Sequence, residues 1–257
     1  MNGLAQLLQI SQDMLWLHAI VFFRVGPIMA LFPGFGERQV PVRVKLVLSL
    51  AFTAVVAPAA QSHVDPGAAA DLTLGWIIIA ETATGLMIGL GLRLFLLALQ
   101  TAGSMAAQAT SLSQILGSAG ATPLPAIGHV LTMGGIALAM ILKLHVHVAY
   151  MVIATYAIFP VGELPDAGAA SQWGIAQVAG SFSLAFSLAA PFVLISVLYN
   201  LTLGIINRAM PQMMVVFVGA PVITAGGLVL LFLLAPVMLG LWGAALQEFI
   251  ANPFGSR

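Results

Sequence analysis

Six long apolar stretches restrict what this chain can fold into. They cover residues 15–32, 44–60, 72–99, 124–159, 178–203 and 213–246. A helix needs about 20 residues to cross the hydrocarbon core of a bilayer, and a lone strand there would leave its backbone donors and acceptors unpaired. The stretches therefore predict an all-α membrane protein with about six long hydrophobic helices. The fourth stretch is much longer than one crossing, so its helix is expected to be tilted, kinked or divided near Lys143.

The composition agrees with this class of protein. Of the 257 residues, 61% are hydrophobic and 6% are charged, whereas soluble domains carry about 25% charged residues. A single integral membrane domain over 1–257 is therefore expected, with no soluble domain. The formal net charge is zero, so nucleic acid is not an expected partner. Cysteine is absent, which excludes disulfides and Cys-ligated metals. The first basic residue, Arg24, already lies in an apolar stretch, so no cleaved signal peptide is expected.

The connections between the stretches differ in charge. Residues 32–45 carry three basic side chains against one acidic side chain, and the turn at 204–212 carries Arg208. The connections at 61–71 and 161–172 carry acidic side chains and no Lys or Arg. Basic connections favour the cytoplasm. Six crossings then place both termini outside and the turn with Arg208 inside.

Among the ionisable residues within the stretches, three are singled out for polar contacts inside the membrane, where a charge is costly and marks a functional candidate. They are Arg24, Glu81 and Arg93. Glu81 and Arg93 are separated by about 18 Å along one helix, which is too far for them to pair with each other. For Arg24 and Glu81, pairing that stabilises the structure is favoured over a proton relay. Arg93 could contact another helix or extend to the lipid headgroups.

Residues 101–125 form a long segment without charge, rich in Ser, Thr, Gln, Gly and Ala. A water-facing loop of this length normally carries charges. Such a segment suits a place that is buried in protein or lines a cavity at membrane depth. A short surface loop after a longer third helix is the alternative, and both remain open.

Glycine in the third stretch predicts close helix packing. Gly85 and Gly89 form a G-x-x-x-G pair. Small residues let helix backbones approach in a membrane, where lipid supplies no hydrophobic drive between helices.

The search for catalytic chemistry finds no enzyme motif, neither a nucleophile elbow nor a phosphate-binding loop. His145 and His147 are two positions apart and would point to opposite faces of a helix, unlike the i, i+4 pair of a helical zinc site. With Lys143 they favour a helix break or a polar packing contact over a metal site. We expect no enzyme, no catalytic residue, no metal and no cofactor.

The stretch from 199 to 221 gathers most of the polar chemistry of the C-terminal half. Its Gly and Pro residues mark places where helical geometry is relaxed or stopped. We predict a tight turn between two hydrophobic helices, with Arg208 at its tip. The residues assigned to this hairpin tip, for assembly contacts, are Asn200, Gly204, Asn207, Arg208, Pro211, Gln212, Gly219 and Pro221.

This block resembles the signature of the FliR family of flagellar export-gate proteins, whose virulence-secretion counterparts are called SctT. The N-terminal half is similar too. Arg24 is followed by Pro33, Arg38, Pro41 and Lys45, which match the family's pattern around the first connection. Arg93, then residues 101–103 and Gln108, lead into the small-residue segment as they do in the family. The chain departs from the family at Val216, where Phe is frequent, and at residues 144–147, where the family has Asn-Gly-His.

The resemblance implies a role in protein translocation across the bacterial inner (cell) membrane, as a multi-pass protein in the flagellar basal body. The implied partners are FliP and FliQ subunits, a FlhB-type switch protein, a FlhA-type export component, unfolded export substrates and membrane lipid. It also implies a FliP-like part over about 1–172 and a FliQ-like helical hairpin over about 173–257. The first connection would lie at the entrance, and a plug loop would close the pore. The residues implied for the plug are Gln108, Ser111, Ser113, Gln114, Gly117, Gly120 and Pro123.

The residues leave three alternative functions open. The virulence-secretion counterpart would look similar. A secondary transporter would use Glu81 and Arg93 to bind a small solute, and it predicts an internal repeat with paired broken helices. An intramembrane enzyme would need a Ser or His with a converging base.

Overall fold

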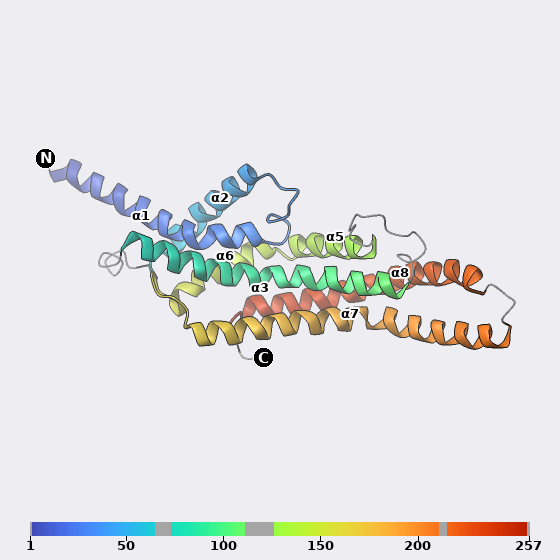
Figure 1. The fold of residues 1–257 in the computed structure, drawn as a ribbon. Helices are drawn as coiled ribbons and strands as arrows, with labels where there is room; N and C mark the ends of the chain where they lie inside the picture. The colour runs from blue at the N-terminus through green and yellow to red at the C-terminus, as the bar shows by residue number, and fades with distance from the viewer. Residues whose placement is uncertain (1, 65–72, 111–125, 211–214, 256–257) are drawn as a thin grey trace. The chain divides into compact units, whose positions relative to one another are not determined.

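The computed structural model describes residues 2–64, 73–110, 126–210 and 215–255 of the chain. Within these residues the regular structure is entirely helical (Figure 1). The helices are α1 (Asn2–Leu31), α2 (Val42–Ala60), α3 (Leu74–Ala109), α5 (Ala126–Ile141), α6 (Leu144–Ile158), α7 (Ala167–Ala209) and α8 (Val215–Ala251). The prediction of an all-α membrane protein is confirmed. Five helices are long and apolar enough to cross a membrane, or six spans if the bent pair α5–α6 counts as one.

The chain divides into two compact units. Unit 1 comprises residues 1–93, 140–177 and 247–257, and unit 2 comprises residues 94–139 and 178–246. Helices α3, α7 and α8 each contribute residues to both units. The predicted FliP-like and FliQ-like parts, with a boundary near 172, follow the chain in order and stay a prediction.

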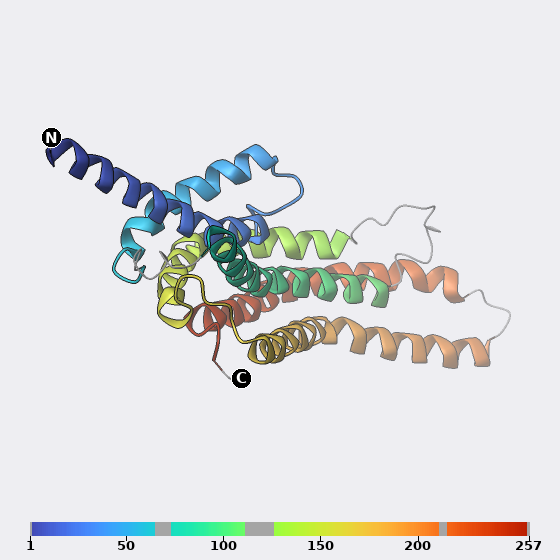
Figure 2. The ribbon, with the colours of Figure 1, turned by 60° about the vertical axis from the view of Figure 1, so that its left-hand side comes forward.

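In unit 1, α1 and α2 pack against each other in opposite directions, and α2 also contacts α6 (Figure 2). A buried cluster joins α1 to the start of α3, where Ile20 meets Ile77. Trp16 and Val161 cover this cluster. Trp76 donates its indole N–H to the carbonyl of Gly162 at 2.9 Å, which ties α3 to the α6–α7 connection. The core of unit 1 therefore lies where α1, α3 and the end of α6 meet.

In unit 2, one indole N–H and one hydroxyl donate hydrogen bonds to the backbone of α3. Trp242 of α8 is fully buried and donates to the carbonyl of Phe95 at 2.8 Å. Ser181 of α7 donates to the carbonyl of Leu94 at 2.9 Å. These bonds tie α7 and α8 to α3, and the bond from Trp242 is buried, where water does not compete for the carbonyl.

The fourth apolar stretch is divided as predicted. It forms α5 and α6, which meet at a bend of 68°. Lys143 stands at the bend with φ of 54°, in the left-handed region that side chains other than glycine rarely adopt. The prediction of a break near Lys143 is confirmed.

Three helices extend about ten residues or more beyond their apolar stretches at one end. Helix α1 begins at Asn2 instead of 15, α3 continues to Ala109 instead of 99, and α7 begins at Ala167 instead of 178. Four of the nine residues in the segment 101–109 are Ala, which favours a helix whether or not lipid surrounds it. Asp166 caps α7 by accepting a bond from the amide of Ala169 at 2.8 Å. The alternative of a longer third helix is therefore correct for the first part of the uncharged segment. Residues 111–125 lie outside the described residues.

The glycine pair of α3 packs as predicted. A methyl group placed on Gly85 would overlap the backbone carbonyl of Arg24, and one on Gly89 would come within 3.2 Å of Ile28 Cα. Helices α1 and α3 therefore approach so closely that only glycine fits at Gly85.

Candidate functional site

Among the residues that the structure describes, the polar side chains with the most bonds form a buried ion pair in unit 1. Arg24 of α1 donates from Nε to Glu81 Oε2 at 2.7 Å and from Nη2 to Glu81 Oε1 at 3.0 Å. Both side chains are fully buried. The two parallel bonds form the bidentate geometry in which Arg–carboxylate pairs are strongest. The structure thus brings together two of the three residues that the sequence analysis singled out for polar contacts inside the membrane.

Helix α6 supplies the remaining partners of Arg24. Nη1 donates to Thr155 Oγ1 at 3.2 Å, and Nη2 donates to the carbonyl of Phe159 at 2.9 Å. The guanidinium also lies over the ring of Tyr156, 3.7 Å from its centroid. Glu81 Oε1 accepts a further bond from the amide of Gly162 at 3.3 Å. One ion pair therefore connects α1, α3, α6 and the start of the α6–α7 connection.

This arrangement suits a structural role better than proton transfer. Four bonds use Arg24 donors, and the carboxylate is held by the guanidinium and a backbone amide. A relay needs a group that can exchange its proton with water or a neighbour, and both side chains have no exposed surface. The bonds between the two side chains, and from each to the backbone, offset the cost of burying two charges.

The third ionisable residue has its own partner. Arg93 near the middle of α3 forms an ion pair with Glu37 of the first connection, and both side chains are only partly exposed. Lys45, in the first turn of α2, donates to the carbonyl of Gly36 at 2.8 Å. The sequence left open whether Arg93 extends to the headgroups or contacts another part of the protein. The structure shows that it contacts another part of the same chain.

The predicted entrance residues surround these two contacts. Pro33 is buried, and Arg38 is exposed. Pro41 stands directly before α2, and its carbonyl accepts from the amides of Val44 and Lys45. The connection is therefore fixed at both ends, while Arg38 remains available to other molecules.

The residues assigned to the hairpin tip are arranged differently. Asn200, Gly204, Asn207 and Arg208 all lie on the last three turns of α7 and are exposed. Asn200 donates to Ser196 Oγ at 3.2 Å, and no described residue bonds to the side chains of Asn207 or Arg208. Pro211 and Gln212 lie outside the described residues. Gly219 and Pro221 fall in the first turns of α8.

Gly219 has a packing role within the hairpin. It is buried, and a methyl group at this position would overlap the hydroxyl of Tyr199 on α7. The hydroxyl is buried and has no hydrogen-bond partner among the described residues. The absence of a side chain at Gly219 therefore makes room for the Tyr199 ring between α7 and α8.

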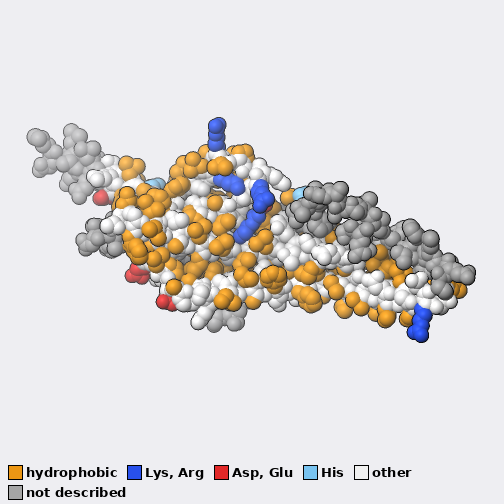
Figure 3. Space-filling view, in the orientation of Figure 1, with side chains coloured by type: hydrophobic (Ala, Val, Ile, Leu, Met, Phe, Trp, Pro, Cys, Tyr) orange, Lys and Arg blue, Asp and Glu red, His pale blue; other side chains and the backbone are white. Residues whose placement is uncertain are grey.

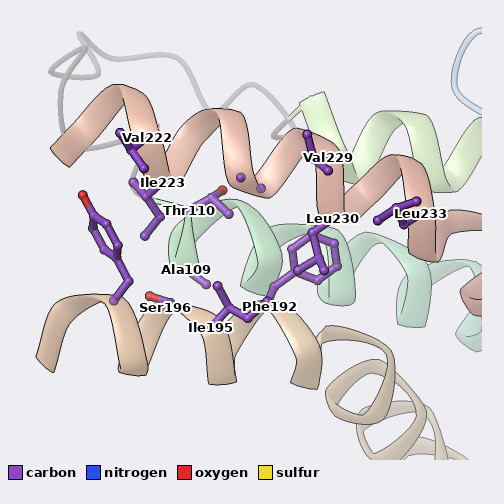
Figure 4. Close-up of a pocket in the computed structure, with 13 residues that line it drawn as sticks. Ala109, Thr110, Phe192, Ile195, Ser196, Val222, Ile223, Val229, Leu230 and Leu233 are labelled. Atoms are coloured by element: carbon purple, nitrogen blue, oxygen red, sulfur yellow. The ribbon is translucent and has the colours of Figure 1, made fainter. Parts of the chain in front are cut away.

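A mostly apolar pocket of about 380 Å³ opens beside this contact in unit 2 (Figure 4). Helices α7 and α8 supply most of its lining, including Phe192, Ile195 and Leu230, and Thr110 closes one side from the end of α3. Sequence reasoning did not identify this pocket, because apolar residues on two separate helices carry no signal that they face a common space.

The predicted plug residues fall mostly beyond what the structure describes. Gln108 is exposed in the last turn of α3, so it is helical. Ser111, Ser113, Gln114, Gly117, Gly120 and Pro123 lie outside the described residues. Their role stays a prediction.

His145 and His147 lie in the first turn of α6, directly after the bend. Among the described residues, no three His, Asp or Glu side chains gather as metal ligands. His147 Nδ1 lies 3.1 Å from the carbonyl of Lys143.

Together, these features define a multi-pass helical membrane protein whose buried charges hold its helices together. The sequence model described as "Bacterial export proteins, family 1" matches residues 15–249. The chain belongs to this family, the FliR family of flagellar export proteins.

Relatives of similar length carry one name, "Flagellar biosynthetic protein FliR". The protein from Caulobacter vibrioides is 33% identical over 97% of this chain and 98% of its own length. The Escherichia coli K12 protein is 25% identical over 90% of each chain, and the Aquifex aeolicus protein is 25% identical over 93% of each. The similarity therefore extends over the whole fold and both units.

Proposed function

We propose that this chain is a subunit of the flagellar protein export gate in the bacterial inner membrane. With FliP and FliQ subunits it would form the channel that passes unfolded flagellar substrates, with FlhB-type and FlhA-type components at the entrance. The family and the names of the relatives support a flagellar role over a virulence-secretion or solute-transport role. The chain would act as a structural part of this channel and not as an enzyme.

The observation that carries the proposal is the uncovered apolar surface of α7. In the most apolar part of this helix, only 28% of the residues are buried within the chain. Large exposed apolar side chains extend from Val178 to Ile206. At 1.5 Å per residue this distance is about 42 Å along the helix, whereas the hydrocarbon core is about 30 Å thick. An average tilt of about 20° shortens the projection only to about 39 Å.

At the average tilt, the hydrocarbon core therefore leaves part of this surface uncovered. A band of apolar side chains that reaches beyond the hydrocarbon core would be exposed to water, which is costly at about 25 cal/mol per Å². Other hydrophobic subunits packed along α7 would cover the remainder. An assembly of several membrane proteins satisfies this requirement, which supports a subunit role over that of a monomeric solute transporter.

Photo-crosslinking on α7 tests the assembly. Phe186 is 60% exposed and Phe192 is 1% exposed, so the two phenylalanines form a matched pair on one helix. A photoreactive phenylalanine analogue at position 186 should yield crosslinks to FliP-type or FliQ-type subunits in flagellated cells. The same analogue at position 192 should yield crosslinks only within the chain.

Two results would contradict the proposal. One is a chain that purifies in mild detergent as a lone monomer, with position 186 crosslinked only to lipid. The other is normal secretion of flagellar substrates in cells that lack the chain.

The proposed plug has a separate test. Deletion of residues 111–120 removes most of the assigned plug residues and should make the membrane permeable to ions when the gate is assembled. Unchanged ion conductance in these cells would remove the plug from the proposal and leave the channel role intact.

A further inference from the structure

The residues that follow α8 form a turn with the sequence Asn252-Pro253-Phe254-Gly255. Proline at the second of these positions ends the helix, because it has no amide to donate and disfavours a helical residue before it. Asn at the first position, Pro at the second and Gly at the fourth are typical of a type I turn. The amide of Gly255 donates to the carbonyl of Asn252 at 3.4 Å and closes the turn. We call residues 252–255 the strap.

The strap is bonded to the start of α7. Trp173, in the second turn of α7, donates its indole N–H to the carbonyl of Pro253 at 2.7 Å. The ring of Phe254 lies against the same indole, with 5.9 Å between the ring centroids. These three side chains are half-buried. The strap therefore fastens the end of α8 to the start of α7 within unit 1 (Figure 2).

A second ring contact connects the strap to the end of α6. The centroids of Phe254 and Phe159 are 5.1 Å apart and their planes meet at 84°, an edge-to-face geometry that aromatic pairs favour. The carbonyl of the same Phe159 accepts the bond of 2.9 Å from Arg24 Nη2. Phe159 directly follows α6, and its φ of −123° and ψ of 88° are not helical. Because the helix stops before this residue, the contact with Phe254 helps to fix where its carbonyl points.

Helix α3 holds the indole that the strap contacts. Gly91 of α3 is buried, and a methyl group at this position would come within 2.6 Å of the Phe249 ring and 3.1 Å of the Trp173 indole. Phe249, near the end of α8, is itself buried. Both rings therefore pack on bare backbone of α3, which fixes the indole that bonds to the strap.

Carboxylates surround this end of unit 1. Glu163, Asp166 and Glu248 are exposed, and Figure 3 shows Asp and Glu side chains over the α6–α7 connection and the start of α7. Exposed carboxylates indicate water and not lipid hydrocarbon at this end, because a charge in hydrocarbon is costly. The strap is therefore held by its contacts with the protein, and those described include one hydrogen bond from Trp173 and two ring contacts.

We propose that the strap opens and closes on Trp173 and Phe159, and that its closed position holds the carbonyl of Phe159 against Arg24. A half-exposed element with few contacts opens at a lower free energy than the buried core. When the strap is open, the end of α8 is released from the start of α7, and the end of α6 loosens. The buried ion pair of Arg24 and Glu81 then loses one of its supporting bonds. The strap thus couples the ends of α7 and α8 to this ion pair.

Hydrogen–deuterium exchange of the full chain in mild detergent tests the coupling. Phe254→Ala removes both ring contacts of the strap. The amides of residues 159–162 should then exchange about tenfold faster, which corresponds to about 1.4 kcal/mol. The amide of Gly162 bonds to Glu81, so it reports on the ion pair directly. The amides of α8 in unit 2 should exchange as in the wild type.

Three further variants separate the contacts. Phe254→Tyr keeps the ring and should exchange like the wild type. Trp173→Phe keeps a ring but removes the N–H that bonds to the strap, and should give a smaller increase of about threefold at residues 159–162. Phe232→Ala is the matched control, because Phe232 of α8 is 81% exposed and undergoes the same truncation. It should leave the exchange of residues 159–162 unchanged.

A second background distinguishes coupling from a general loss of stability. In the Arg24→Met/Glu81→Leu chain the carbonyl of Phe159 has no arginine to meet, so Phe254→Ala should accelerate exchange at residues 159–162 less than in the wild type.

Three results would overturn the proposal. They are unchanged exchange at residues 159–162 in Phe254→Ala, an equal acceleration through both units, and the same acceleration at residues 159–162 in the two backgrounds. All of these measurements use the purified chain without partner subunits, so the strap and the proposed function can fail separately.

Discussion

Two groups of polar residues lie on apolar helices of this chain but differ in burial and in bonding. Arg24 and Glu81 are fully buried and bonded to each other, to α6 and to the α6–α7 connection. Asn207 and Arg208, at the end of α7, are exposed and bond to no other described side chain. The two charges of the first group pair with each other inside the chain. The charge of Arg208, in the second group, is exposed and can contact other molecules.

The difference separates residues that maintain the fold from residues that contact other molecules. A buried charge is tolerated only when it is paired and bonded, so the Arg24–Glu81 pair constrains the packing of three helices. An exposed cation at a helix end contributes little to folding. The resemblance to the export family includes both groups, but their physical roles are distinct.

Removal of one charge of the buried pair should have the largest effect. Glu81→Leu leaves Arg24 buried without its counter-charge, and we expect a loss of about 3–5 kcal/mol of stability. The unfolding temperature of the purified chain in detergent and its level in the membrane measure this loss. The Arg24→Met/Glu81→Leu double variant removes both charges and should lose less than the single variant. A single variant as stable as the wild type would show that the pair does not hold the helices together.

The close approach of α1 and α3 should give an intermediate effect. Gly85→Ala places a methyl group against the carbonyl of Arg24 and forces the helices apart, at a cost of about 1–3 kcal/mol. Gly75→Ala on the same helix has no atom within 4 Å and serves as the matched control. The control should be neutral or slightly stabilising, because alanine favours a helix. Equal unfolding temperatures for the two variants would contradict the packing.

Arg208→Ala should have the smallest effect on the fold and a clear effect on function. We expect the stability to change by less than about 0.5 kcal/mol, because the side chain is exposed and bonds to no described residue. Recovery of FliP-type and FliQ-type subunits with the chain, and secretion of flagellar substrates, should both fall more than the amount of chain in the membrane. Normal assembly and secretion in this variant would place Arg208 with the residues that have no contact role.

The sequence predicted the helices better than their ends. All six apolar stretches are helical in the described residues, and the break at Lys143 was expected from the length of one stretch. The ends of α1, α3 and α7 were wrong by about ten residues because hydropathy reports what lipid favours. Whether a helix continues into a polar segment depends on residue propensity and capping, as at residues 101–109 and at Asp166.

The sequence predicted the pairing of charges only in part. The cost of a charge in lipid required partners for Arg24 and Glu81, and it favoured pairing over a proton relay. The identity of the partners could not be derived, because the pattern along one helix does not record which face meets which neighbour. Glu37 was therefore missed as the partner of Arg93, and the pocket of unit 2 was not predicted.

The Arg24–Glu81 pair also has a consequence for how the chain enters the membrane. Synthesis delivers Arg24 first, and Glu81 follows 57 residues later. Until then α1 carries a lone charge, which at the centre of a membrane helix costs about 2.5–3.5 kcal/mol. We expect α1 to stay in the insertion machinery until α3 arrives, so that the two segments enter the lipid with this charge pair already formed.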